Sequence, residues 1–214
     1  MGRFDVILEG LSYYKRRRKY LLAITTAYYG LIFLTALMIV SIEGGVDLQA
    51  AIREAAVGGV LEAFPGLLEA YLRNPLLAIV YTFFVNFFLG TVAYITIPGT
   101  LVFFLAPALA FYRATMWGVV FAPTTPVLAM AVVLSLPTLI LEGLGYVLAV
   151  VPSTYLGLSW LSPKRVLREE KLSRKEAFKK ELVNSAKAYV WVALVLLVAA
   201  VVEVVSVQLL HSIS

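Results

Sequence analysis

The sequence contains no cysteine and only one histidine, His211, close to its C-terminal end. The lack of cysteine excludes disulfide bonds, thiolate metal sites and cysteine nucleophiles. A single histidine cannot build a histidine-based catalytic or metal cluster, and the chain has no His-Glu-x-x-His or Gly-x-Ser-x-Gly pattern. We therefore expect no enzymatic activity, no metal site and no cofactor.

Charged residues are also scarce. They make up 14% of the 214 residues, whereas 61% are hydrophobic and the mean hydropathy is +0.90. A soluble domain is usually about 45–50% apolar. The composition therefore predicts an integral membrane protein and argues against a disordered chain or a nucleic-acid-binding protein.

Glutamine and asparagine are rare as well, with two and three residues respectively. Few thermolabile side chains in a chain rich in Lys, Glu and Arg are typical of thermophilic proteins. We expect a thermophilic source.

The first apolar run, residues 20–42, is long enough to span a membrane, which takes roughly 20 residues. A basic tract precedes it directly: Lys15, Arg16, Arg17, Arg18 and Lys19. Residues 1–19 carry six basic and two acidic side chains, an excess that marks the cytoplasmic side. We predict a retained anchor rather than a cleaved signal peptide, with a basic cytoplasmic segment 1–19 that attracts anionic lipid headgroups.

The next stretch, residues 43–74, carries five acidic and two basic side chains and fits the outer side. Its apolar residues recur at helical spacing, and Gly58–Gly59 and Pro65–Gly66 interrupt the pattern. We expect two short amphipathic helices at the outer interface. Two further spans, 75–96 and 101–121, should form a helical hairpin around a tight turn at 97–100.

The apolar stretch 126–161 is too long for one span and too short for two. Pro137 is the expected break, because proline removes a backbone hydrogen bond and disfavours helix just before it. We predict a half-span over 126–136 and a crossing over 138–161, which ends at the interface anchors Trp160, Lys164 and Arg165. In the alternative, the crossing starts at Pro126.

Residues 162–187 form the second cytoplasmic segment, with nine basic and four acidic side chains between 164 and 187. Ser173 and Glu176 have the spacing of a capping box, which predicts a helix start. The last span, 188–210, would place the C-terminus outside. The predicted fold is an all-α transmembrane bundle over residues 20–214, with about five spans plus the broken helix, in the cell membrane.

Three ionisable residues fall inside the predicted spans: Arg113, Glu142 and Glu203. Each is costly in hydrocarbon, so we expect them to face one another in a buried charge cluster. This cluster could be a structural clamp, a proton or ion path, or a contact for a lipid headgroup or peptide. Asn86, in the middle of the second span, is expected to form an interhelical hydrogen bond.

Several of these residues together resemble a known family. Pro137, Thr138, Glu142 and Gly143 lie in the stretch Pro-Thr-Leu-Ile-Leu-Glu-Gly, and Asn86 is followed by Gly90 in the second span. This pattern resembles the stage II sporulation protein M family of prokaryotic membrane proteins, whose typical motif is proline-histidine-glycine, two apolar residues, then glutamate. Thr138 and Leu139 replace the histidine and glycine here.

The resemblance implies a non-catalytic membrane scaffold or an accessory subunit of a membrane complex. Its expected partners are the lipid bilayer, including anionic lipids, and either another membrane protein or further copies of this chain. The competing hypothesis is a small channel or secondary transporter that uses the buried charges at the broken helix.

Overall fold

The computed structural model describes residues 3–167 and 172–213, and all regular elements in these ranges are helices. This confirms the predicted all-α class. The elements are α1 (Arg3–Arg16), α2 (Arg18–Ser41), α3 (Gly45–Ala63), α4 (Gly66–Arg73), α5 (Pro75–Phe84), the π-helix η1 (Val85–Thr96), α6 (Ile97–Leu101), α7 (Leu105–Val120), α8 (Pro126–Leu161), α9 (Pro163–Leu167) and α10 (Arg174–Ile213).

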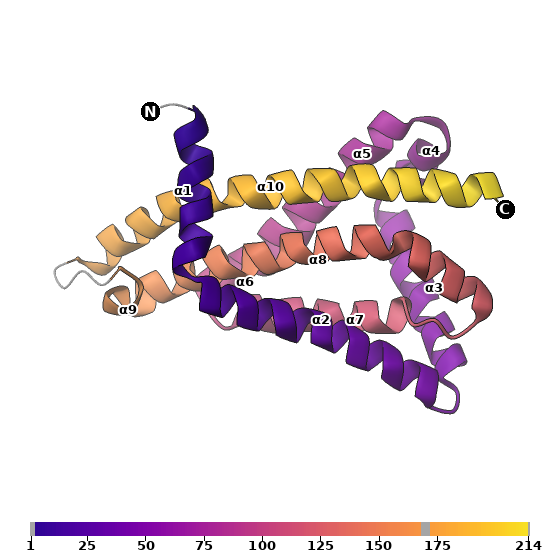
Figure 1. Ribbon diagram of the computed structural model, residues 1–214. Helices are drawn as coiled ribbons and strands as arrows, with labels where there is room; N and C mark the ends of the chain where they lie inside the picture. The colour runs from indigo at the N-terminus through magenta and orange to yellow at the C-terminus, as the bar shows by residue number, and fades with distance from the viewer. Residues whose placement is uncertain (1–2, 168–171, 214) are drawn as a thin grey trace.

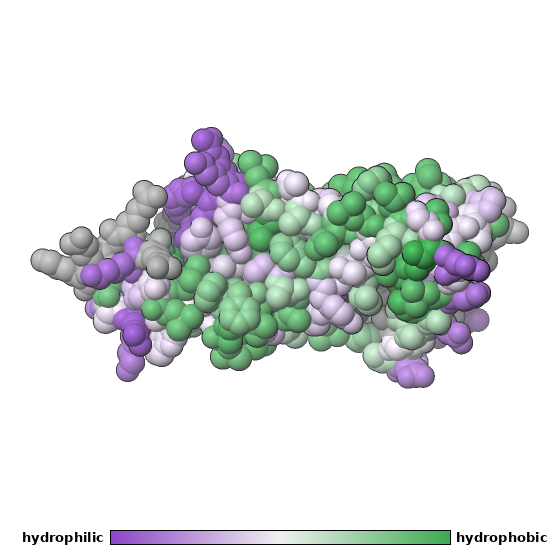
Figure 2. All heavy atoms as spheres, turned by 90° about the horizontal axis from the view of Figure 1, so that it is seen from below, coloured by the Kyte–Doolittle hydropathy of each residue, from purple (hydrophilic) through white to green (hydrophobic). Residues whose placement is uncertain are grey.

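The long helices run along a common axis, with α8 among α2, α6, α7, η1 and α10 (Figure 1). Helices α1 and α9 lie towards one end of the molecule, while α3, α4 and the C-terminus lie towards the other (Figure 1). Hydrophobic residues cover much of the middle and hydrophilic residues gather at the two ends (Figure 2). This distribution is the one expected of a multi-pass membrane protein.

In the part of the chain that the structure describes, four helical stretches are long and apolar enough to cross a membrane: α2, the continuous run Pro75–Leu101, α8, and Arg174–Leu209 of α10. The expected span at 101–121 is shorter than predicted. Helix α7 has 16 residues, or about 24 Å at 1.5 Å per residue, whereas the hydrocarbon core is about 30 Å thick. It packs between α2 and α8 as part of the bundle.

Helix α8 continues through Pro137 without a break, so the predicted half-span over 126–136 is wrong. The helix starts at Pro126, as in the alternative, and Thr125 caps it by accepting a hydrogen bond from the Leu128 backbone N–H at 3.2 Å. Its N-terminal part is inclined to the rest (Figure 1). A proline inside a long helix can bend it without ending it, since only one backbone hydrogen bond is lost.

A second proline, Pro152, also lies inside α8, and a tyrosine of α1 compensates for its missing N–H. The carbonyl of Leu148, four residues earlier, has no backbone donor at position 152. The Tyr14 hydroxyl lies 3.2 Å from this carbonyl and 3.1 Å from that of Ala188 in α10. Tyr14 therefore joins α1, α8 and α10 at one point.

Two other predicted helix breaks lie at different positions in the structure. The turn expected at 97–100 lies at 102–104, because the chain stays helical through Leu101 and Pro98 sits in the first turn of α6. Gly58 and Gly59 lie inside α3, and the chain leaves the helix at Phe64–Pro65 instead. Two helices occupy this stretch, α3 with 19 residues and α4 with eight, so only the second is as short as expected.

The predicted capping box is confirmed at the start of α10. The Ser173 backbone N–H donates to Glu176 Oε2 at 2.9 Å, and the Glu176 backbone N–H donates to Ser173 Oγ at 3.3 Å. From Arg174 the helix runs without interruption through the predicted last span.

Candidate functional site

Glu142, in α8, is an acidic side chain buried in the apolar middle of the bundle, where it is 7% exposed. The side-chain amide of Asn86, in η1, donates a hydrogen bond to Glu142 Oε1. Two polar residues of different helices thus meet inside the bundle, where a hydrogen bond replaces the water that each of them loses on burial.

Tyr146, one turn after Glu142, connects this pair to Arg113. The Tyr146 hydroxyl donates to Asn86 Oδ1 at 2.7 Å and accepts from Arg113 Nη2 at 2.7 Å. The Arg113 guanidinium lies 4.1 Å from the centre of the Tyr146 ring. No ion pair joins Arg113 to Glu142 or Glu203, all three of which lie in the described ranges.

Glu203, in α10, approaches Glu142 from the other side. The two carboxyl groups are within hydrogen-bonding reach of each other. Glu203 Oε1 also accepts a hydrogen bond from the Tyr71 hydroxyl, in α4, at 2.7 Å. The structure therefore brings the two carboxyls together. The Arg113 guanidinium reaches Glu142 only through three successive hydrogen bonds, by way of Tyr146 and Asn86. We call this set the carboxyl network: Asn86, Arg113, Glu142, Tyr146, Glu203 and Tyr71.

Three buried polar atoms near this network have no hydrogen-bond partner among the residues that the structure describes: Thr138 Oγ1, the Tyr28 hydroxyl and Arg113 Nε. Thr138 lies one turn before Glu142 on α8. Tyr28, in α2, is close enough to interact electrostatically with Arg113 and Glu142. Buried polar groups in proteins are nearly always satisfied, so unpartnered atoms mark places that water or a ligand can occupy.

The π-helix η1 sets the position of Asn86. The buried residues of η1 are Asn86, Gly90, Thr91 and Ile95. They recur every four or five residues, whereas the buried face of an α-helix recurs every three or four. A Cβ on Gly90 would lie 2.9 Å from the Tyr146 ring, so only glycine allows this contact. π-helical turns are frequent at functional sites.

Of the other residues of the proline-glutamate motif, only Gly143 has a clear packing role. Pro137 is exposed, and Thr138 is buried with no hydrogen-bond partner among the described residues. A Cβ on Gly143 would lie 2.9 Å from the Tyr29 hydroxyl and 3.0 Å from the Tyr28 ring. Gly143 thus lets α8 approach α2 closely.

A second buried charged site, which the sequence analysis did not identify, lies at the basic end of the molecule. Glu181, in α10, is fully buried and accepts from the Tyr13 hydroxyl at 2.6 Å and from Arg17 Nη2 at 2.9 Å. The Arg17 guanidinium lies over the rings of Tyr13 and Tyr155, at 3.7 and 4.3 Å. This site fastens the junction of α1 and α2 to α10 and α8.

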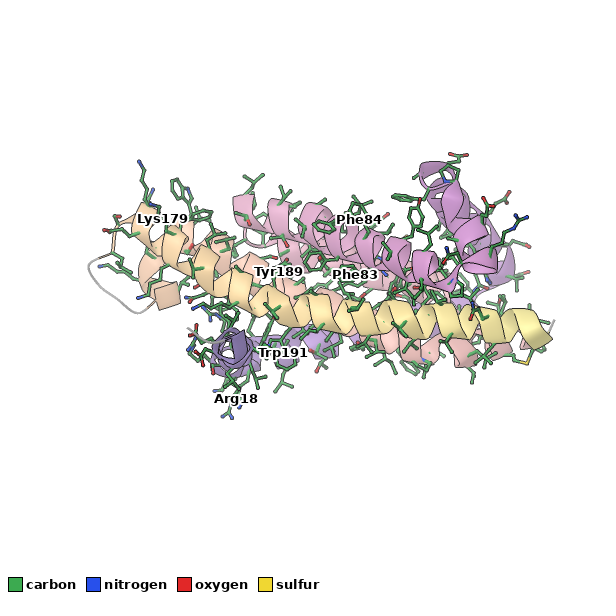
Figure 3. All side chains as sticks on the ribbon, turned by 90° about the horizontal axis from the view of Figure 1, so that it is seen from above. Arg18, Phe83, Phe84, Lys179, Tyr189 and Trp191 are labelled. Carbon is green, nitrogen blue, oxygen red and sulfur yellow. The ribbon has the colours of Figure 1, made fainter. Side chains whose placement is uncertain are left out.

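Arg17 therefore differs from the rest of the basic tract, because it faces inward. The other four residues of the tract are exposed: Lys15, Arg16, Arg18 and Lys19. Arg18 points away from the bundle (Figure 3).

A further contact joins α1 to α10. The Trp191 indole, in α10, donates to the Ile7 carbonyl of α1 at 2.9 Å.

The remaining predicted anchors lie at the same end. Trp160 is 45% exposed and makes an edge-to-face contact with Phe178 of α10. Lys164 is exposed on α9. Arg165 is also in α9, and its side chain lies outside the described part of the structure.

A small polar pocket lies between α1 and α10, next to the basic tract, and is lined by Glu9, Ser12, Tyr13, Arg16, Asn184 and Lys187. An ion pair between Lys187 and Glu9 bridges the two helices here. Within the described residues, no group of three His, Asp or Glu side chains is placed to hold a metal ion.

Comparison with known proteins finds no relative: no family model, no curated protein and no solved structure matches this chain.

Proposed function

We propose that this chain is a non-catalytic subunit of the cell membrane, a scaffold or accessory component of a membrane complex like the family it resembles. The observation that carries the proposal is the hydrogen bond from Asn86 to Glu142. These are two of the residues on which the resemblance rests, and they come from separate helices. Their contact supports the idea that the motif defines a packing unit.

The glycines that accompany the motif support the same proposal. Gly90 and Gly143 are covered by the aromatic rings of neighbouring helices, and a Cβ on Gly118 would lie 2.6 Å from the Ile32 carbonyl of α2. Small residues allow helix backbones to approach closely, which favours helix association in a bilayer. The motif thus holds together a rigid platform whose outer surface is available to lipid and to partner helices.

The test is affinity purification of the tagged chain from its native membranes in a mild detergent. We expect one or more membrane proteins to be recovered in fixed ratio to the chain. An unrelated tagged membrane protein of similar size, purified in parallel, identifies background. Recovery of the chain alone in repeated preparations, with no partner above this background, would contradict the proposal.

The second candidate function is a small proton-linked channel or transporter. The specific observation in its favour is the Glu142–Glu203 pair, because ionisable residues within membrane-spanning helices often belong to ion or proton pathways. The test is ion and proton flux in reconstituted liposomes. Flux that is lost in Glu142→Gln but retained in Glu176→Gln, an exposed control, would favour this function over the scaffold.

A further inference from the structure

We propose that Glu142 and Glu203 together hold one proton, which makes them an acid site between α8 and α10 in which Glu142 is buried and Glu203 is half-buried. The ligand of this site is the proton itself, shared between the two carboxyl groups. The proposal holds for either candidate function, because it depends only on the geometry of the network.

The first argument is hydrogen-bond chemistry. An ionised carboxylate has acceptor oxygens and no donor, so two carboxyl groups can hydrogen-bond only if one of them is protonated. Glu142 already accepts from Asn86, and Glu203 accepts from Tyr71. The two carboxyls are nevertheless within hydrogen-bonding reach of each other. A proton between them supplies the missing donor.

The second argument is charge balance. Arg113 is the only basic residue in the five predicted spans, and the same spans contain two acidic residues, Glu142 and Glu203. The titratable or charged groups that surround the pair are Arg113 from α7, Tyr28 from α2, Tyr146 from α8 and Tyr71 from α4. The tyrosines are neutral at pH 7. One guanidinium and two carboxyls that share one proton sum to zero, which removes the cost of a net charge in an apolar interior.

The third argument is the unpartnered polar atoms around the pair. Thr138 is 6% exposed and shares a helix face with Glu142, and Tyr28 is 0% exposed. Neither hydroxyl has a partner within the described part of the chain. Such atoms are positions for ordered water, through which a proton can enter and leave a buried site.

The test is infrared difference spectroscopy of the whole protein in lipid nanodiscs at neutral pH. A protonated carboxyl gives a carbonyl stretching band that is absent for carboxylates. We expect this band in the wild-type protein, with a shift in heavy water. We expect its loss in Glu142→Gln and in Glu203→Gln, because a single carboxylate beside an amide needs no shared proton.

Glu181→Gln is the matched control. Glu181 is fully buried as well, but it is bonded to Arg17 and Tyr13 and lies outside the carboxyl network. This variant should keep the band. A wild-type protein with no such band, or a band that survives in both single variants, would overturn the proposal. The wild-type measurement can therefore overturn the proposal even if a variant fails to fold.

Discussion

At the scale of single residues, a side chain can supply the hydrogen bond that a backbone carbonyl loses when a proline lies four residues later in a helix. Tyr14 is the clearest case, since its hydroxyl lies close to the carbonyl left without a donor by Pro152. Tyr14→Phe removes this hydrogen bond and leaves a buried carbonyl unsatisfied. We expect a loss of about 1–3 kcal/mol in the free energy of unfolding, measured by thermal or denaturant unfolding in detergent.

The chain offers its own control for this effect. Pro152→Ala restores a backbone N–H that can donate to Leu148, so Tyr14→Phe should cost clearly less in a Pro152→Ala background. Tyr112→Phe, at a position 58% exposed, should have little effect. An equal loss from Tyr14→Phe in both backgrounds would show that the tyrosine acts through packing instead.

At the scale of elements, a helix boundary that depends on neighbouring residues could be predicted from the sequence. A feature that depends on contacts between distant residues could not. The capping box at Ser173 is contained within four residues, and its helix starts as predicted. Whether Pro137 bends or ends a helix depends on the elements that pack around α8, so the local rule fails there. Arg17 faces inward because of Glu181, which is 164 positions away.

The same reasoning applies to the candidate site. The sequence alone identifies four residues of this site, because placing a charged or polar side chain in an apolar span costs free energy. They are Arg113, Glu142, Glu203 and Asn86. It cannot supply Tyr146 and Tyr71, because tyrosine is an ordinary residue in such segments and only the structure places these hydroxyls in the carboxyl network. The π-helix was not predicted either, because the apolar residues of 85–96 also fit an ordinary membrane-spanning helix.

The exposed basic residues around the junction of α1 and α2 lead to a prediction about lipids. Replacing Lys15, Arg16, Arg18 and Lys19 with glutamine should weaken binding of anionic lipid by about 1 kcal/mol per charge. Native mass spectrometry with mixed anionic and zwitterionic lipid would measure the retained fraction of each. Arg17 is left intact because it stabilises the fold, and Lys175→Gln, on α10, provides a single-charge comparison. Unchanged lipid selectivity in the fourfold variant would contradict the prediction.

At the scale of the whole molecule, the arrangement of charged segments suggests how the protein lies in the bilayer. The basic segments around α1 and α9 share one end of the bundle, and α3 and α4, with their acidic excess, lie at the other (Figure 1). The positive end should face the cytoplasm. Helices α2, α5 to α6, α7, α8 and α10 follow one another in alternate directions, which takes the C-terminus to the end opposite α1 and α9 although α7 is short (Figure 1). We therefore expect the C-terminus outside.

The absence of cysteine makes this orientation directly testable, because any introduced cysteine is the only thiol in the chain. Glu54→Cys on α3 and Gln208→Cys near the end of α10 are exposed positions. Both should react with a membrane-impermeant maleimide in intact cells. Lys175→Cys, exposed near the start of α10, should react only after the membrane is opened. Labelling of positions 175 and 208 from the same side would mean that α10 does not cross the bilayer. Labelling of 54 and 208 from opposite sides would mean that α7 does not provide a crossing, and the C-terminus would then share the side of the N-terminus.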